Sequence, residues 1–230
     1  MSRRDPRAGG GRPMAVELIG PAGAGKSTVA KALARCHPDV RAGFSLWGLP
    51  WRLLAASAPE LLSPMLVGAR AGKPLHQREL AQVLRMAALR RIVHRPRTER
   101  DVLLLDEGPI FGFTWLEVFF AREADPGWAS WRRKAVSRWG ALLDAVVWLD
   151  AADAVIASRI RARPKSHPIK GLDDPEIYGF TAQFRQAFGR VIEDLKAARS
   201  LTVYRVRSDR ESPENIALRL RAALRATDGR

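Results

Sequence analysis

Four short apolar runs stand out along the chain, each followed by a turn-forming, acidic or polar residue. They cover residues 14–19, 101–109, 144–151 and 201–206. Runs of this length that are apolar at nearly every position are typical of strands buried on both faces, as in a parallel sheet. Between them lie longer segments whose apolar positions recur every three to four residues, which is the period of a helix that faces a core.

The helical pattern accounts for most of the remaining chain. It predicts two short helices within residues 44–69 and further helices over 26–36, 74–95, 110–122, 128–143, 152–163, 176–198 and 212–224. Ser212 stands where the last helix needs an N-cap, with Glu214 in its first turn. Apolar strands that alternate with helices predict an α/β fold of three layers, with helices on both faces of a parallel sheet that we expect to have five strands.

The junction between the first strand and the first helix has an unusual composition. Residues 18–33 read LIGPAGAGKSTVAKAL, and Gly20 to Ser27 match G-x-x-x-x-G-K-[ST] in full. This spacing, between a strand and a helix, is that of the phosphate-binding loop, or Walker A motif. Its glycines let backbone N–H groups and the helix N-terminus surround a nucleotide's phosphates. A plain glycine-rich turn gives no reason for the Lys-Ser-Thr that follows.

The motif assigns roles to single residues. Lys26 places a cation between the β- and γ-phosphates, Ser27 offers its hydroxyl to Mg²⁺, and Thr28 adds a contact to the α-phosphate. The expected cofactors are therefore ATP and Mg²⁺, the metal arriving with the nucleotide. The predicted nucleotide-binding residues are Gly20, Pro21, Ala22, Gly23, Ala24, Gly25, Lys26, Ser27 and Thr28.

Composition narrows the class of protein. The chain has 230 residues, which is enough for one domain over 14–230, and we expect residues 1–13 to form a disordered leader. The leader has no apolar core and is not a secretory signal. No segment predicts a membrane span, because the longest apolar stretch is short and carries Glu117. The single cysteine, Cys36, excludes an internal disulfide and fits a cytoplasmic protein.

The net charge of +15 raises nucleic acid as a partner. Arginine supplies 32 of the 39 basic residues, however, and the chain holds a single asparagine, which together indicate a compositional bias of the genome. No pattern of a nucleic-acid-binding module accompanies the charge, so nucleic acid is not expected as a partner.

Beyond the loop, the sequence resembles P-loop NTPases, and within them the nucleoside and nucleotide kinase group with a thymidylate-kinase-like layout. The resemblance implies that Asp106, at the end of the VLLLD strand, helps to hold Mg²⁺, and that Glu107 positions or deprotonates the acceptor. For Glu107, a role in the turn alone stays open. The long segment at about 44–100 is then the acceptor-binding insertion, although padding of the core by helices is the alternative.

The same resemblance implies a lid over about residues 159–174. Arg159 and Arg163 lie four positions apart and would share a helix face, from which they could neutralise charge on the transferring phosphoryl group. Arg161 points elsewhere on a regular helix. The competing interpretation is that these are solvated arginines of an arginine-rich protein. The final loop, 207–210, would lie near the adenine.

The match departs from the family at the acceptor. Thymidylate kinases carry Asp-Arg where this chain has Asp106-Glu107-Gly108, so the acceptor need not be a nucleoside monophosphate. A nucleoside, a sugar, an antibiotic or another alcohol stays open. Trp47, Trp51 and the aromatic segment 111–120 either pack the core or bind an apolar acceptor or partner.

Other nucleotide-binding functions remain as alternatives. A GTPase would show the guanine motif N-K-x-D, and the only asparagine, Asn215, has no such context. An ATP-hydrolysing protein would also end its strand in Asp-Glu, and a non-catalytic ATP-binding regulator would need Lys26 but not Asp106. The expected function is ATP-dependent phosphoryl transfer to a small molecule. A homodimer is left open.

Overall fold

A computed structural model describes residues 14–94, 102–122, 125–164 and 166–228, with side chains to residue 224. The expected leader at 1–13 and the end of the insertion at 95–100 lie outside the described residues. Within the described part, no helix combines the length and apolar character that crossing a bilayer requires.

The core of the fold is a parallel sheet of five strands, as predicted. In space the strands follow the order β2-β3-β1-β4-β5, and every neighbouring pair is parallel. Their bounds are β1 (Met14–Ile19), β2 (Val40–Phe44), β3 (Val102–Asp106), β4 (Ala145–Asp150) and β5 (Thr202–Arg207).

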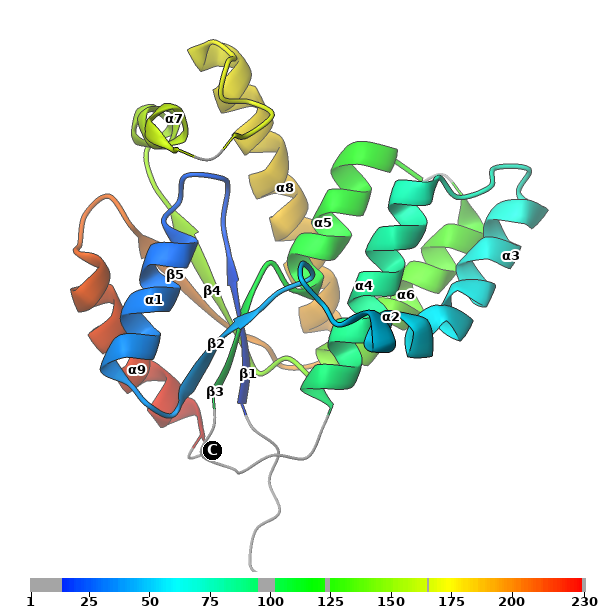
Figure 1. Cartoon of the computed structure of the whole chain (residues 1–230), viewed down its shortest axis with the longest axis horizontal. Helices are drawn as coiled ribbons and strands as arrows, with labels where there is room; N and C mark the ends of the chain where they lie inside the picture. The colour runs from blue at the N-terminus through cyan, green and yellow to red at the C-terminus, as the bar shows by residue number, and fades with distance from the viewer. Residues whose placement is uncertain (1–13, 95–101, 123–124, 165, 229–230) are drawn as a thin grey trace, which may run out of the picture.

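Two groups of helices cover the sheet, which gives the three predicted layers (Figure 1). On one face lie α1 (Lys26–Cys36) and α9 (Pro213–Asp228). On the other face lie α4 (Gln77–Val93), α5 (Pro109–Phe120), α6 (Pro126–Gly140) and α8 (Asp174–Ala198). The outer side of that group carries α2 (Trp51–Ser57), the 3₁₀ helix η1 (Ala58–Leu61) and α3 (Leu62–Arg70), and α7 (Asp153–Ala162) follows β4.

Alternation along β1 shows why both faces need cover. Val16 and Leu18 are fully buried against α1 and α9, whereas Ala15 and Ile19 are buried among the helices of the opposite face. Successive side chains of a strand point to opposite faces, so an apolar run forms two cores at once.

The sequence pattern located four strands, and the fifth is β2. This strand contains Arg41 and Gly43, is largely exposed, and pairs with β3 alone at the edge of the sheet. An edge strand needs no continuous apolar run, so its pattern is weak. The short helices within 44–69 are present as α2, η1 and α3. The predicted N-cap is also present, since the Asn215 N–H donates to Ser212 Oγ at 3.2 Å.

The fold defines a place where a ligand can bind. After β1 the chain forms α1 on one face, and after the neighbouring β3 it forms α5 on the other (Figure 1). Parallel sheets open a crevice at the carboxyl ends of such a strand pair. Leu18 pairs with Asp106 in register, so the glycine-rich loop and the acidic end of β3 meet in this crevice.

Candidate active site

The glycine-rich loop takes a conformation that only glycines tolerate. Gly20, Gly23 and Gly25 have φ angles of 147°, 85° and 87°. A Cβ on Gly20 would lie 2.1 Å from the carbonyl oxygen of Leu149, so β4 packs directly on the loop backbone. No side chain caps the N-terminus of α1, and its first residues, Lys26, Ser27 and Thr28, line the cavity. An uncapped helix start of this kind is an anion-binding site.

Lys26 stands at the base of this loop. Its Nζ donates to the carbonyl oxygens of Gly20 at 2.8 Å and Pro21 at 3.2 Å. Burial lowers the pKa of the Lys26 amine, while the nearby carboxylates of Asp106 and Glu107 act in the opposite direction. The ammonium is therefore held against the loop and within electrostatic reach of both acids.

Ser27 and Asp106 meet as the sequence predicted. Ser27 Oγ donates to Asp106 Oδ2 at 3.1 Å, whereas the buried Asp106 Oδ1 has no hydrogen-bond partner among the described protein groups. A hydroxyl beside a carboxylate with a free oxygen fits Mg²⁺, which takes few protein ligands and completes its shell with water and phosphate oxygens. No group of three or more His, Cys, Asp or Glu side chains in the described part forms a more extensive metal site.

Glu107 adopts a strained backbone at the turn into α5. Its φ is 62°, in the left-handed region that residues other than glycine rarely occupy. The carbonyl of Glu107 accepts from the Leu46 N–H at 3.1 Å, which ties the turn to the segment after β2. Its side chain lines the cavity beside Asp106. Backbone strain of this kind concentrates at functional sites, so Glu107 remains a candidate site residue.

The strained turn is supported by Glu17, which the sequence analysis did not single out. This fully buried β1 side chain accepts from the N–H groups of Ile110 at 2.9 Å and Phe111 at 3.0 Å, so it caps α5 from a different strand. Burial raises the pKa of Glu17 to about 8, against hydrogen bonds that lower it, among them one from the Gly108 backbone. In the sequence, the only sign of this role was an acidic residue within an otherwise apolar predicted strand.

The predicted lid residues come together with the loop, although not as a regular helix face. Helix α7 ends at Ala162, so Arg163 is its extended C-cap rather than a helical residue. Both Arg159 and Arg163 still line the cavity. Arg159 donates to Ser208 Oγ and to the Ser208 carbonyl, each at 3.0 Å, and to the Gly23 carbonyl at 3.4 Å.

Two further side chains complete this region. Arg161 pairs with Asp174 and lies outside the cavity lining, as expected for a residue on another side of α7. His167 lies in the cavity wall, and burial lowers the pKa of its imidazole, with the charges of Arg163 and Lys26 acting in the same direction. The sequence analysis did not single out His167.

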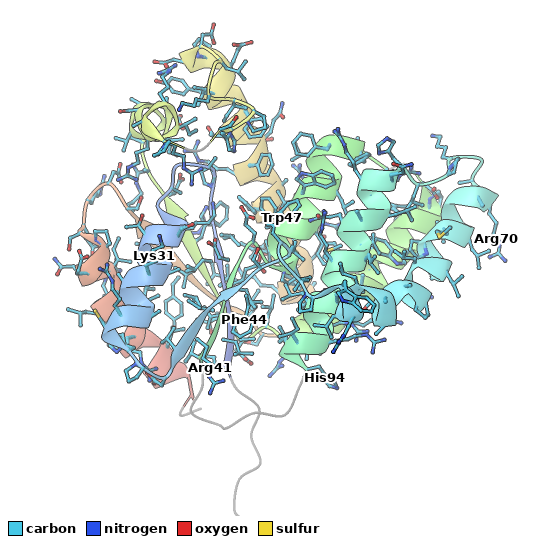
Figure 2. All side chains as sticks on the ribbon, viewed as in Figure 1. Lys31, Arg41, Phe44, Trp47, Arg70 and His94 are labelled. Atoms are coloured by element: carbon cyan, nitrogen blue, oxygen red, sulfur yellow. The ribbon has the colours of Figure 1, made fainter. Side chains whose placement is uncertain are left out.

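The phosphate loop, Asp106, Glu107, Arg159, Arg163 and His167 line the same cavity, which has a volume of about 1380 Å³. Typical ligand pockets measure roughly 300–1000 Å³, so the cavity has room for a second molecule besides a nucleotide. Ser208, in the loop 207–210 that we expected near the adenine, and Ile216 of α9 line one end. The opposite end is walled by aromatic side chains, namely Trp47, Phe111, Trp115, Phe119, Phe120, Phe180 and Phe184. Figure 2 shows Trp47 at the junction between the sheet and the helical group.

An ion-pair cluster beside the cavity was also missed. Arg185 of α8 donates to both carboxylate oxygens of Asp150 at 3.0–3.1 Å, to Asp153 at 2.6 Å and to the Ala151 carbonyl at 3.2 Å. These bonds join the end of β4, the start of α7 and the middle of α8. An arginine within a long amphipathic helix gives no sequence signal of such partners.

Comparison with solved structures identifies the class of fold. The structure is similar to shikimate kinase from Bacteroides thetaiotaomicron, with a TM-score of 0.50 and 18% identity over 92% of this chain and 98% of that chain. It is also similar to deoxyadenosine kinase from M. mycoides with products dCMP and dCDP bound, with a TM-score of 0.54 and 12% identity over 93% and 99%.

A third similar structure is the YorR protein from Bacillus subtilis in complex with phosphorylated GDP, with a TM-score of 0.55 and 14% identity over 94% of this chain and 99% of that chain. At these identities the likeness shows the fold, which is the three-layer fold of P-loop kinases, as predicted. No protein-family model and no curated protein matches the sequence.

Proposed function

We propose that this protein is a P-loop kinase that transfers the γ-phosphoryl group of ATP to a hydroxyl of a small molecule in the cytoplasm. The observation that carries the proposal is the shared cavity. It brings together an uncapped helix N-terminus, Lys26, the Ser27–Asp106 pair and Arg159 at one end, and leaves an aromatic compartment at the other. A site that only bound or hydrolysed ATP would not need this second compartment.

The residues divide the work of positioning and charge neutralisation. The loop amides and Lys26 bind the phosphates, and Arg159 and Arg163 neutralise charge on the transferring group. Ser27 and Asp106 would hold Mg²⁺, which when bound screens the phosphate charge. Glu107, at the boundary between the two compartments, would orient the acceptor hydroxyl and accept its proton.

The similar solved structures support this assignment, since two are named as kinases of small molecules. Membership of the nucleoside and nucleotide kinase group, with a thymidylate-kinase-like layout, remains part of the proposal. Its support comes from the phosphate loop, and the acceptor residues add none. Homodimerisation also stays a prediction.

Substitution of Lys26 tests the proposal. We expect Lys26→Ala to lower ATP turnover in the presence of acceptor pools by at least about 100-fold, because the cation that stabilises the transferring charge is lost. The matched control is Lys31→Ala, an exposed lysine on the same helix α1 that points away from the cavity (Figure 2). The measurement is ADP formation, with thermal unfolding as a check that both variants fold.

The same assay separates the alternative functions. A kinase forms ADP slowly alone and quickly with its acceptor. Equal ADP formation with and without acceptor pools would indicate an ATP-hydrolysing protein. ATP binding without turnover under any condition would indicate a regulator. Either result, or full activity of Lys26→Ala, would contradict the proposal.

A further inference from the structure

The acceptor half of the cavity is distinguished by the arrangement of its aromatic side chains. Phe111, Trp115 and Phe119 follow one another at intervals of four on α5, so they form a stripe along one helix face. With a rise of 1.5 Å per residue, the stripe extends about 12 Å from the first turn of α5 toward its C-terminal end. Its inner end adjoins Glu107, which directly precedes the helix cap Gly108.

Helix α8 supplies a second stripe that faces the first. Phe184 lies 6.4 Å from Phe111 and 6.1 Å from Phe119, and Phe180 lies 6.4 Å from Phe119, measured between ring centroids. Phe180 and Phe184 are one helical turn apart and 4.9 Å from each other. The two helices lie side by side (Figure 1). The result is an elongated apolar wall and not a single stacking platform.

Packing of the core explains only part of this wall, because Phe184 is 6% exposed and belongs to the core while Phe111 and Phe180 pack against it. Phe113, on another face of α5, is 1% exposed and belongs to the core, whereas Phe119 is 49% exposed and lines the cavity. Trp47, on the far side of the same compartment, is 46% exposed. Large apolar side chains left open within a cavity mark a surface that a ligand covers.

The polar side chains nearest the aromatic wall are few. Asp106 and Glu107 lie at the inner end, and His76 and Arg78 line the outer end, where the His76 ring lies 6.0 Å from that of Phe120. No described asparagine or glutamine lines the cavity. A site that reads a sugar or a nucleobase needs hydrogen-bonding groups along the length of its ligand, since unpaired polar groups of the ligand would otherwise be buried.

We propose that the acceptor is an elongated, largely apolar primary alcohol, whose hydroxyl lies at Glu107 and whose chain lies along the aromatic wall of α5 and α8. This inference rests on the proposed kinase function. In the reaction the alcohol oxygen forms a bond to the γ-phosphorus, and the bond from that phosphorus to the β,γ-bridging oxygen breaks, with its electrons leaving on ADP. The hydroxyl proton goes to the Glu107 carboxylate, and the products are an alkyl monophosphate and ADP.

The test compares acceptors of different chemistry on the full-length protein with ATP and Mg²⁺. Farnesol, dispersed in a non-ionic detergent, represents the proposed class, and thymidine, deoxyadenosine and glucose represent the others. We expect ADP formation and a new phosphate ester with farnesol and with none of the other three acceptors. Phosphorylation of a nucleoside or of glucose, without farnesol phosphate, would overturn the inference while leaving the kinase function intact.

Variants locate the binding surface. We expect Phe119→Ala to raise the KM for farnesol by about 10-fold or more, because an aromatic contact that the bound chain would bury is lost, with little change in the Kd for ATP. The control is Trp51→Ala, which removes an aromatic that is 72% exposed on α2 and does not line the cavity. Phe180→Ala repeats the test on α8 should Phe119→Ala fail to fold.

The two proposals fail in different ways. An unchanged farnesol KM in both cavity variants would overturn the apolar site. Tight ATP binding without phosphoryl transfer to any acceptor would overturn the kinase function and, with it, the inference.

Discussion

The two halves of the cavity that we propose for the nucleotide and for the acceptor are built in different ways. The proposed nucleotide half is built mainly from the segment 20–28, in which all residues but the buried Ala24 line the cavity, with Gly20 packed against β4. The acceptor half is built from side chains of α5, α8 and the segment after β2, which are far apart in sequence. Backbone amides that surround a phosphate require a fixed order of glycines, whereas an apolar surface requires only that side chains of suitable size converge. The first therefore leaves a motif, and the second does not.

The largest expected effect comes from filling the space beside the loop backbone. Gly20→Ala places a Cβ 2.1 Å from the Leu149 carbonyl oxygen at a φ of 147°. We expect the free energy of unfolding to fall by about 2–5 kcal/mol, from strain and overpacking together, and nucleotide binding to be lost. Chemical denaturation and ATP titration measure the two effects.

A second glycine provides the control. At Gly179, within α8, an added Cβ meets nothing within 4 Å. Gly179→Ala should raise the free energy of unfolding by roughly 0.5–1 kcal/mol, because alanine favours a helix. Equal destabilisation by both substitutions would contradict the special role of the loop backbone.

A smaller effect is expected at the boundary between the halves, where Glu17 supports the start of α5. Its pKa is raised from 4.5 to about 8, so between these values the unfolded chain loses a proton that the folded protein keeps. The stability that this group contributes is complete below pH 4.5 and is lost as the pH rises through about 8. We expect the free energy of unfolding to fall across this range.

Glu17→Gln removes that titration. The variant should show a flatter dependence of unfolding free energy on pH, measured by urea denaturation at several pH values. Its stability at low pH should be lower by about 1–3 kcal/mol, because an amide NH₂ replaces one of the oxygens that accept from Ile110 and Phe111. If the slope is the same in both proteins, Glu17 is not the buried acid that we describe.

The smallest expected effect concerns His167. Burial and the positive charges of Arg163 and Lys26 lower the pKa of its imidazole in the free protein. Bound phosphates would favour the charged imidazole and raise its pKa. ATP binding should therefore take up protons, and it should weaken as the pH rises from the pKa of His167 in the free protein to the pKa in the complex. Calorimetry near pH 6.5 in buffers of different ionisation enthalpy measures the uptake, which His167→Ala should reduce. Equal uptake in the two proteins would exclude His167 from the phosphate site.

The fold was largely predictable, because buried strands and amphipathic helices have different periods. The strands β1, β3, β4 and β5 and the order of the helices followed from those periods. The strand β2 did not, because it lies at the sheet edge and is mostly exposed. Helix α7 ends one residue earlier than predicted, so Arg163 is its C-cap and has an extended backbone.

The candidate site was predictable only where its chemistry requires residues at a fixed spacing along the sequence. The glycines, Lys26 and Ser27 form a contiguous motif, and Asp106 ends a recognisable strand. The support of Glu17 for α5 spans 93 residues of sequence, and no local pattern encodes such a distance. For the same reason, the aromatic residues of α5 could be predicted as core or as ligand surface, and only their exposure in the cavity favours the second.

The three hydrogen bonds of Arg159 have a consequence for how fast and how tightly an anion can be captured. Its guanidinium is already bonded to the Ser208 hydroxyl and carbonyl and to the Gly23 carbonyl. A long side chain that is free in solution loses much rotational freedom when a ligand immobilises it. Here the hydrogen bonds within the protein already restrict the rotations of the Arg159 side chain. A phosphate that binds to it would therefore cost little further side-chain entropy.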